Sequence, residues 1–475
     1  MEEGTFDTLI PSRYISFTLP LNSIIISQNH YFHTENLQIS VLDSPSLQLP
    51  INSPKIAAML VPKFRENDWI FNTELGQLQL LFSFPEISRL ILIGNAHDND
   101  DNVGKLYKRS VELNPFRREE LEKSLYPLLT VLLPNEIDKA DDFHVPFLRY
   151  EDNVISSVIL DKCIGTCVGE MLVEDVEIEG CSREFRRRLR FKRMPNLVQS
   201  EIYIVPRVTD EKSSDFFDFE KAEFCPNLEV LVHPYLAPMV VGLALVAVHI
   251  QERFESGVQP RGCCMGVGGG ALLSFLSINL GFEVVGVEVD EVVLSVAEKY
   301  FGLETGQGIQ LCVGDGIEIL KKAACYDENY KSSRNLASNI RELDCCRTKF
   351  ELFRSKFDVI MVDLDSSDSK MDISAPPLEF LQKDVLLAAK SCLFEHIILV
   401  LNVIPRNQTF YNLVIHALRE VFDDLHELDV GNGENFVLIA SKTSIDWNSG
   451  APENVFMSKL KSVISEMYID AIRKV

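Results

Sequence analysis

The second half of the chain alternates short, continuously apolar runs with amphipathic stretches. Short apolar runs without polar alternation are typical of parallel strands that are buried on both faces. The stretches between them repeat apolar residues every three or four positions, as helices do. The predicted strands are Gly262–Val267, Val284–Val289, Ile309–Val313, Phe357–Val362 and Ile397–Val403. The predicted helices are Met239–Gln251, Ser274–Leu280, Val292–Phe301, Gly316–Ala324 and Leu378–Leu393.

This alternation predicts an α/β domain with a mostly parallel sheet over residues 226–475. Near its end, Leu425–Val430 and Phe436–Ser441 flank the turn Gly431-Asn432-Gly433. The pattern predicts a C-terminal antiparallel hairpin at the edge of the sheet. The polar stretch Lys321–Lys356 has no clear pattern, and we expect it to be an insertion on the rim of the sheet.

In the middle of the chain, apolar and polar residues alternate one by one. This period predicts a small antiparallel β module over residues 146–225. Its predicted strands are Val154–Leu160, Gly169–Ile178, Glu184–Phe191 and Val198–Val205. The module also carries a basic cluster formed by Arg183, Arg186, Arg187, Arg188, Arg190, Lys192 and Arg193. We interpret the cluster as the solvated face of a hairpin; the alternative is a contact for an anion or a substrate near a cleft.

Residues 1–145 have a mixed pattern without a chemical signature. Lys55–Val61 and Arg89–Ile93 are apolar enough to form buried strands, and Asn67–Phe84 has helical periodicity. The helix would begin at Asn67-Asp68, residues that favour the N-terminal cap. We therefore expect an N-terminal α/β segment of unknown role.

Composition narrows the class of protein. The 475 residues include 46 Lys+Arg and 70 Asp+Glu, for a net charge of −24, which disfavours binding to nucleic acid. The longest apolar run, Met239–Ile250, is shorter than the ~20 residues of a membrane span. Eleven cysteines without regular spacing argue against a disulfide framework, and the acidic start does not resemble a signal peptide. These features predict a reduced, cytoplasmic protein.

The strongest chemical signal is the turn Gly266-Val267-Gly268-Gly269-Gly270, between a predicted strand and a predicted helix. Such a turn lets the backbone approach a ligand closely and directs amide N–H groups toward it. Glu288 ends the next strand, 22 residues after Gly266. An acid about 20 residues after the turn is typical of binding to ribose hydroxyls.

Two further predicted strands end in acidic residues. Asp315-Gly316 follows the third strand, where a carboxylate can accept a hydrogen bond from the amine of an adenine ring. The fourth strand ends in Asp363-Leu364-Asp365, at the rim where open α/β sheets bind ligands. Each acid alone is more often a helix cap or a solvated loop residue. Their ordered succession at strand ends favours a site for a nucleoside-containing cofactor.

In these motifs the chain resembles the class I S-adenosylmethionine-dependent methyltransferases, which have a Rossmann-like sheet, and their spermidine-synthase-like branch. The resemblance is to the C-terminal domain of the elongation factor 1-alpha lysine and N-terminal methyltransferase family (methyltransferase-like protein 13). It covers roughly residues 50–440. The motifs are Asp68–Phe71, Glu74–Gly76, Val145–Leu148, Phe185–Arg187, Val198–Glu201, Met239–Leu245, the glycine turn, Val287–Asp290, Asp315-Gly316, Asp358–Asp365, and Leu401-Asn402 with Arg406.

The resemblance implies S-adenosyl-L-methionine as the cofactor and a role for each matching residue. On the cofactor side, Gly266, Gly268 and Gly270 would shape the methionine-side turn, Glu288 would bind ribose, Asp290 would support that loop, and Asp315 and Gly316 would face adenine. Asp363 would lie beside the sulfonium and the incoming amine as the catalytic residue. Asp365 and Asn402 would line the acceptor side. No metal ligands are implied.

The resemblance implies methyl transfer to an N-terminal α-amine or a lysine of elongation factor 1-alpha or a similar basic protein. It also suggests a homodimer, and we expect no nucleic-acid or membrane partner. Two departures keep alternatives open. Cys264 stands where many class I enzymes have an acid, and no second glycine turn precedes residue 145, so a non-catalytic scaffold is one alternative. Aminopropyl transfer is the other, although Ala271 and Leu272 follow Gly270 where spermidine synthases have an aspartate.

Overall fold

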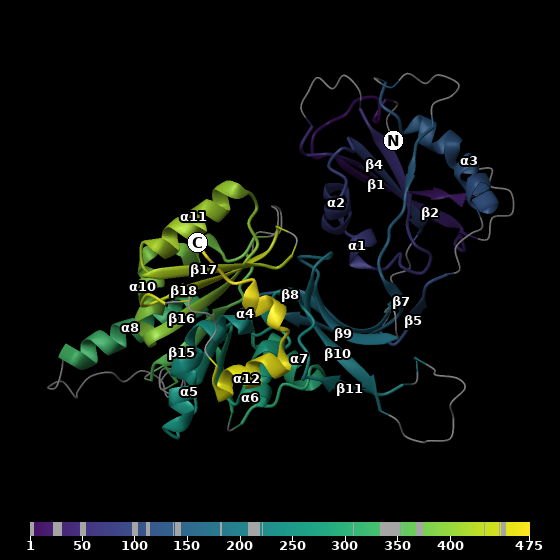
Figure 1. Ribbon diagram of the computed structural model, residues 1–475. Coiled ribbons are helices and arrows are strands. Elements are labelled where there is room, and N and C mark those ends of the chain that lie inside the picture. Colours follow the sequence, from purple (N-terminus) through teal and green to yellow (C-terminus); the bar gives the residue numbers. More distant parts are fainter. Residues whose placement is uncertain are drawn as a thin grey trace.

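The computed structural model describes most of the chain, and its strands in the described part form three sheets (Figure 1). We call them the N-terminal sheet, the β module and the C-terminal sheet. The described residues are 4–21, 31–47, 54–96, 103–110, 115–135, 137, 144–180, 183–207, 219–220, 222–306, 308–332, 352–353, 355–366, 374–431, 433–445, 447 and 453–475.

The N-terminal sheet has the order β1-β2-β4-β3-β6, with helices on both faces. The predicted strands at residues 55–61 and 89–93 are confirmed as β3 and β4. Asn67–Phe84 forms two helices instead of one, because Thr73 ends the first and caps the second with its Oγ1, which accepts from the Gly76 N–H at 3.0 Å. The elements are β1 (Tyr14–Pro20), β2 (Asn36–Asp43), β3 (Ile56–Leu60), α1 (Trp69–Asn72), α2 (Glu74–Phe82), β4 (Arg89–Asn95), α3 (Pro115–Val131) and β6 (Phe147–Leu148).

The β module has the order β11-β10-β9-β8-β7-β5, and the antiparallel arrangement predicted for it is confirmed. Its apolar face packs against α7 (Glu291–Tyr300) of the C-terminal domain, so the two share a core. Two short strands pair across the domain boundary expected at residue 145. β5 precedes the boundary but pairs with β7 of the module, and β6 follows it but pairs with β3 of the N-terminal sheet. The module strands are β5 (Leu106–Lys108), β7 (Val154–Gly165), β8 (Gly169–Ile178), β9 (Glu184–Phe191), β10 (Val198–Pro206) and β11 (Phe224–Asn227).

The interpretation of the basic cluster as a solvated face holds for Arg183 and Lys192, whose side chains are 47% and 39% exposed, and is wrong for the members in the middle of β9. Arg187 and Arg190 on β9 are only 8% and 5% exposed. Arg187 pairs with Asp175 of β8 at 2.6 Å, and Arg188 pairs with Glu201 of β10 at 2.6 Å. The antiparallel register places these acids opposite the arginines, where cross-strand ion pairs form. The alternation of polar and apolar residues within one strand does not show which residues lie opposite on the neighbouring strands.

The C-terminal sheet has the order β14-β13-β12-β15-β16-β18-β17-β19. Strands β12 to β16 are parallel, and β18 is antiparallel between β16 and β17. This confirms the predicted class I methyltransferase fold with its C-terminal hairpin. The hairpin does not form the edge as expected, because β19 pairs outside β17. The strands are β12 (Arg261–Met265), β13 (Glu283–Glu288), β14 (Ile309–Val313), β15 (Phe357–Val362), β16 (Leu393–Val403), β17 (Asp424–Asp429), β18 (Phe436–Ser441) and β19 (Arg473–Lys474).

Helices cover both faces of this sheet, which explains why its central strands are apolar throughout. One layer contains α4 (Leu236–Val241), η2 (Gly242–Val246), α5 (Ala247–Glu255), α6 (Ala271–Leu280), α12 (Val455–Val463) and α13 (Glu466–Asp470). The other contains α8 (Gly316–Ser332), η3 (Leu378–Leu381), α10 (Lys383–Cys392) and α11 (Gln408–Arg419). Of the expected insertion Lys321–Lys356, α8 includes the first part, and residues 333–351 and 354 lie outside the described residues.

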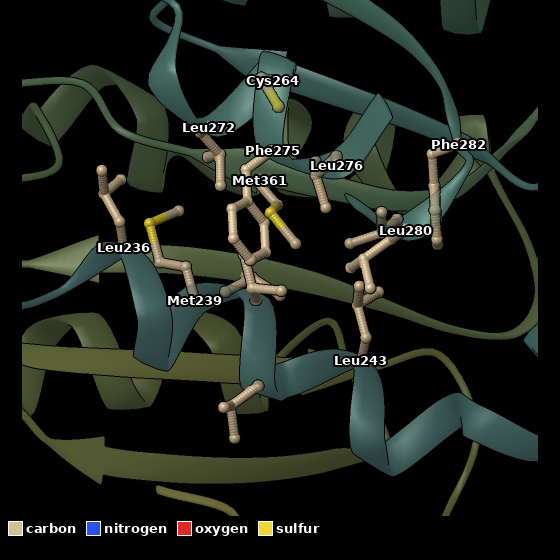
Figure 2. Packing of buried hydrophobic residues seen from close by; sticks show 14 of the residues in the cluster. Leu236, Met239, Leu243, Cys264, Leu272, Phe275, Leu276, Leu280, Phe282 and Met361 are labelled. Carbon is tan, nitrogen blue, oxygen red and sulfur yellow. The ribbon is translucent and has the colours of Figure 1, made fainter. Parts of the chain in front are cut away.

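Figure 2 shows the core between the sheet and the first helical layer. Cys264 is 1% exposed and points into this core, which also contains Phe275 and Met361. A carboxylate at position 264 would be buried without a partner, at a large cost in free energy. The apolar environment therefore accounts for the cysteine at this position. None of the cysteines that the structure describes forms a disulfide bond.

The segment Leu236–Glu255, which comprises α4, η2 and α5, is 20 residues long and apolar enough to cross a membrane by length and composition. It is longer than the run Met239–Ile250 considered from sequence alone. In this fold, 67% of its most apolar window is buried, and it packs in the core shown in Figure 2. A helix that is buried in a protein core can have the same length and apolar composition as a membrane span.

Candidate functional site

The glycine turn lies where the carboxyl ends of β12, β13 and β15 meet. Gly266, Gly268 and Gly270 have φ angles of +85°, +52° and +80°, the left-handed region that favours glycine. A Cβ on Gly266 would lie 2.2 Å from the backbone oxygen of Asp363. The turn therefore presses against the end of β15, and a residue with a side chain does not fit at Gly266 without displacing backbone.

Glu288, the last residue of β13, directs its carboxylate into this turn and is 9% exposed. Its Oε2 accepts from the N–H groups of Val267 at 3.1 Å and Gly268 at 3.4 Å. Its Oε1 accepts from the N–H groups of Val289 at 2.9 Å and Asp290 at 3.2 Å. Burial raises the pKa of Glu288, and these hydrogen bonds oppose the rise.

Asp290 holds the β module against the loop that follows β13. Its Oδ2 accepts from the N–H groups of Cys167 at 2.6 Å and Val168 at 3.0 Å, in the turn between β7 and β8. Its Oδ1 accepts from the Val292 N–H at 3.0 Å and caps α7. Burial would raise the pKa of Asp290, but these N–H donors outweigh it and lower the pKa. The carboxylate is thus a fixed, charged link between two parts of the chain.

Ser200 of β10 makes a second link from the β module to the site. Its Oγ accepts from the Gly269 N–H at 2.7 Å, in a buried position. A Cβ on Gly268 would lie 2.4 Å from the same oxygen. Together with Asp290, this contact shows that the β module supports both the glycine turn and the loop after Glu288.

Asp363 follows β15 and is held by two donors. The Tyr235 hydroxyl donates to its Oδ2 at 2.9 Å, and the Asn402 Nδ2 donates to its Oδ1 at 3.0 Å. Burial raises the pKa of Asp363, the hydrogen bonds from Asn402 and Tyr235 lower it, and the nearby Asp365 raises it; the net shift is upward. The site therefore contains an oriented carboxylate with increased affinity for a proton.

The remaining predicted residues also lie at this rim. The Gly314 N–H donates to the Glu288 backbone oxygen at 2.8 Å, which joins the end of β14 to that of β13. Asp315 is exposed, and its Oδ1 caps α8 by accepting from the N–H groups of Ile317 and Glu318. A Cβ on Gly316 would meet the Met265 sulfur at 3.0 Å. Asp365 lies 3.4 Å from Arg193 of the β module.

The structure thus brings together the residues that sequence reasoning selected, and adds some that it missed. Tyr235, Ser200 as a partner of the turn, and the backbone of Cys167 and Val168 were not predicted as site residues. The His233 ring stacks on Tyr235 at 5.5 Å between centroids, and its Nε2 is buried without a hydrogen-bond partner among the described residues. No local pattern distinguishes these residues, because their roles depend on contacts with distant segments.

The site fits a nucleoside-containing cofactor better than a metal ion. The glycine turn and the Glu288 carboxylate, joined through the N–H groups of Val267 and Gly268, lie at the carboxyl ends of β12 and β13, the edge at which open α/β sheets bind nucleoside-containing ligands. Among the described residues, no group of three His, Cys, Asp or Glu side chains could hold a metal ion.

Curated relatives align with most of the length of this chain. It is 26% identical over 416 residues to an eEF1A lysine and N-terminal methyltransferase of Xenopus laevis. The aligned region covers 85% of this chain and 53% of the relative. A homolog from Drosophila pseudoobscura pseudoobscura is 27% identical, over 82% of this chain and 49% of the relative. The human protein of that name is 24% identical over 84% of this chain and 52% of its own length. The chain therefore spans about half the length of the curated relatives it matches, and the resemblance expected from the sequence is confirmed.

Solved structures with partial similarity include human methyltransferase-like protein 13 in complex with SAH, at 21% identity and a TM-score of 0.38. That match covers 51% of this chain and 95% of the solved chain. A probable spermidine synthase from Corynebacterium glutamicum ATCC 13032 is 12% identical, with a TM-score of 0.40, over 64% of this chain and 86% of the solved chain. No family model matches the chain.

Proposed function

We propose that this protein is an S-adenosylmethionine-dependent methyltransferase that modifies an amine of a protein. The observation that carries the proposal is the Asp363 carboxylate, oriented by Tyr235 and Asn402 and in backbone contact with the glycine turn at Gly266. The names of the curated relatives support the same activity. The order of the strands in the C-terminal sheet is also that of class I methyltransferases.

The residues of the rim would hold the cofactor from several sides. Gly266, Gly268 and Gly270 would receive its methionine part, Glu288 its ribose, and Asp315 with Gly316 its adenine. Asp290 would keep the ribose loop in place through its bonds to the β7–β8 turn. When bound, S-adenosylmethionine supplies an electrophilic methyl group on a sulfonium.

Asp363 would orient the acceptor amine and accept its proton. An amine attacks only as the neutral base, so a carboxylate beside it must receive or stabilise the proton that leaves. Tyr235 and Asn402 prevent rotation of the Asp363 carboxylate, which contributes through alignment. The raised pKa of Asp363 makes it a stronger base than an exposed aspartate.

We propose an N-terminal α-amine or a lysine of eEF1A, or of a similar basic protein, as the acceptor. The names of the relatives support this choice, and a net charge of −24 suits a basic partner because opposite charges increase the rate of encounter. A cytoplasmic location remains a prediction from the sequence, and a homodimer remains a prediction from the family resemblance.

Isothermal titration with S-adenosylmethionine tests the first step. We expect binding by the wild type, and a Glu288→Gln variant that binds at least about tenfold more weakly, the effect of losing one strong hydrogen bond to a charged group. Glu283→Gln is the matched control, since Glu283 begins the same strand and pairs with Arg261 at 3.5 Å. Folded wild-type protein that does not bind the cofactor would refute the proposal.

Labelled S-adenosylmethionine incubated with a whole lysate tests the acceptor. We expect label in protein, and mass spectrometry identifies the modified amine. A parallel reaction uses decarboxylated S-adenosylmethionine as the donor and putrescine as the acceptor. Spermidine formation would favour aminopropyl transfer, and cofactor binding without any transfer would favour the scaffold.

A further inference from the structure

A cavity of about 670 Å³ lies between the N-terminal sheet and the β module. Its walls include Leu60 and Leu148, the last residues of the parallel strands β3 and β6. Open α/β sheets bind ligands at the carboxyl ends of their strands, and ligand pockets usually measure ~300–1,000 Å³. None of the described residues that line this cavity contributes to the site at the C-terminal sheet. The N-terminal domain thus has a candidate binding site of its own.

Basic side chains outnumber acidic ones in this cavity, although the whole chain has a net charge of −24. We therefore call it the basic cavity. The basic residues among its described lining are Lys63, Arg65, Arg109, Arg118 and Arg149, and the acidic residues are Glu151, Asp152 and Glu179. A concave surface with an excess of one charge focuses the electric field and attracts ligands of the opposite charge. The lining therefore favours an anion.

Two of the acids balance two of the arginines. Arg65 pairs with Asp152, and its guanidinium lies over the Tyr150 ring, 5.2 Å from the centroid. Arg109 pairs with Glu179 at 2.5 Å and donates from Nη2 to the Asp152 backbone oxygen at 2.6 Å. These contacts fix Arg65 and Arg109 as parts of the wall, and their charge is compensated within it.

The other three basic residues come from three separate elements. Lys63 follows β3, Arg118 is in the first turn of α3, and Arg149 follows β6 directly. Arg118 pairs through its Nε with Glu122 of the same helix at 2.8 Å, so its Nη groups can bind a ligand. The remaining acid of the lining, Glu151, is exposed. An anion with several oxygens suits this arrangement, because guanidinium groups bind phosphate with paired N–H donors and lysine binds it as a point charge.

We propose that the basic cavity binds a phosphate-bearing small molecule, with Lys63, Arg118 and Arg149 donating to the phosphate oxygens. The volume of about 670 Å³ is much larger than a phosphate ion, so the ligand includes an organic part. Leu60 and Leu148 provide an apolar wall for that part. This site is independent of the proposed function, since its residues do not hold S-adenosylmethionine in that proposal.

Isothermal titration of the full chain with pyrophosphate, ATP and ribose 5-phosphate tests the inference. Pyrophosphate contains no nucleoside, so it distinguishes the basic cavity from the site at the C-terminal sheet. We expect binding by the wild type and a Kd that rises about tenfold in Arg118→Ala and in Arg149→Ala, as for loss of a hydrogen bond to a charged group. Tightest binding of ATP would identify a nucleotide as the ligand, and tightest binding of ribose 5-phosphate would identify a sugar phosphate.

Lys123→Ala is the matched control, because Lys123 is on the same helix as Arg118 but pairs with Glu119 and does not line the cavity. It removes one positive charge and should bind like the wild type. Folded wild-type protein that binds none of the three phosphates at millimolar concentration would overturn the inference, and so would binding that both arginine variants keep. A glutamate-rich peptide that binds where the phosphates do not would replace it with an acidic protein partner. If the phosphates bind as expected but S-adenosylmethionine does not, the proposed function fails and this inference stands.

Discussion

The pKa values of the carboxylates at the ends of the parallel strands are shifted in opposite directions in this site. Burial raises the pKa of Asp363 and of Glu288. The pKa of Asp290 is lowered, because the N–H donors around it outweigh its burial. Asp363 is therefore suited to proton exchange with an amine, and Asp290 to a permanently charged structural link.

Asp363→Asn should abolish most activity and yet stabilise the protein at neutral pH. Because the folded pKa of Asp363 is raised, its ionised form is disfavoured in the native state, and the wild type loses stability as pH rises through that pKa. We expect Tm to rise by about 2–4 °C at pH 7, as for a gain of about 1 kcal/mol in a domain of this size. The difference should vanish below pH ~4, where the carboxyl is neutral in both states.

Differential scanning calorimetry across this pH range measures the effect. Asp358→Asn is the control at the other end of the same strand. Asp358 is wholly buried and accepts from the Arg261 N–H at 2.7 Å, and its carboxylate lies 3.2 Å from Arg253. Loss of its charge leaves Arg253 unpaired, so Tm should fall. A lower Tm for Asp363→Asn at pH 7 would contradict the interpretation that burial disfavours the ionised form of Asp363.

At the scale of elements, the β module acts as part of the site rather than as a separate unit. Its β7–β8 turn bonds Asp290, its strand β10 bonds Gly269 through Ser200, and its apolar face packs on α7. Gly165 lies at this contact, since a Cβ there would be 2.4 Å from the Asp290 carboxylate. The position of the cofactor loops therefore depends on the module.

Asp290→Asn should weaken cofactor binding without unfolding the protein. An asparagine can keep the cap of α7 through its oxygen, but its NH₂ would face the N–H groups of Cys167 and Val168. The loss of hydrogen bonds to a charged group, ~1.5–3 kcal/mol, predicts an increase in Kd for S-adenosylmethionine of about tenfold or more. Isothermal titration measures it.

The control for this variant is Asn454→Ala, which removes the cap of α12. It should cost about 1 kcal/mol of stability, as N-cap losses do, and leave the Kd unchanged. An Asp290→Asn variant that binds like the wild type would show that the contact with the module does not position the ribose loop.

At the scale of the whole molecule, buried ion pairs join the N-terminal domain to the β module. Asp68 accepts from Arg190 of β9 at 2.7 Å and from Arg65 at 2.6 Å, and Arg65 also pairs with Asp152. Burial would raise the pKa of Asp68, but Arg190 and Arg65 hold it far below its usual range. Arg190 also supports the loop that carries Arg193.

Asp68→Ala should destabilise the protein by about 3–5 kcal/mol, the cost of breaking a buried ion pair and leaving its cation unpaired. Urea denaturation measures the change in free energy of unfolding. Glu119→Ala is the matched control, since Glu119 and its partner Lys123 are both exposed. It should change stability by less than about 0.5 kcal/mol. Equal effects of the two variants would mean that the domains are held together by apolar packing alone.

Much of the C-terminal domain could be predicted from the sequence. The strands β12 to β16, the glycine turn and the acids at strand ends follow from local rules, because both faces of the sheet are covered and the turn needs positive φ. The helix at Asn67–Phe84 was predicted as one element, since period alone does not reveal a break at Thr73. Strands β1 and β2 were missed, although their apolar and polar residues alternate one by one as in a half-buried strand.

The sequence by itself determined the class of fold and the location of the site, since apolar period and glycine backbone geometry are properties of short segments. Only the tertiary structure decided which side chains meet there. Ser200 and Gly269 are 69 residues apart, Tyr235 and Asp363 are 128 apart, and Arg193 and Asp365 are 172 apart. The partner of a polar group depends on strand order and register, which arise from packing of the whole chain and leave no local periodic trace.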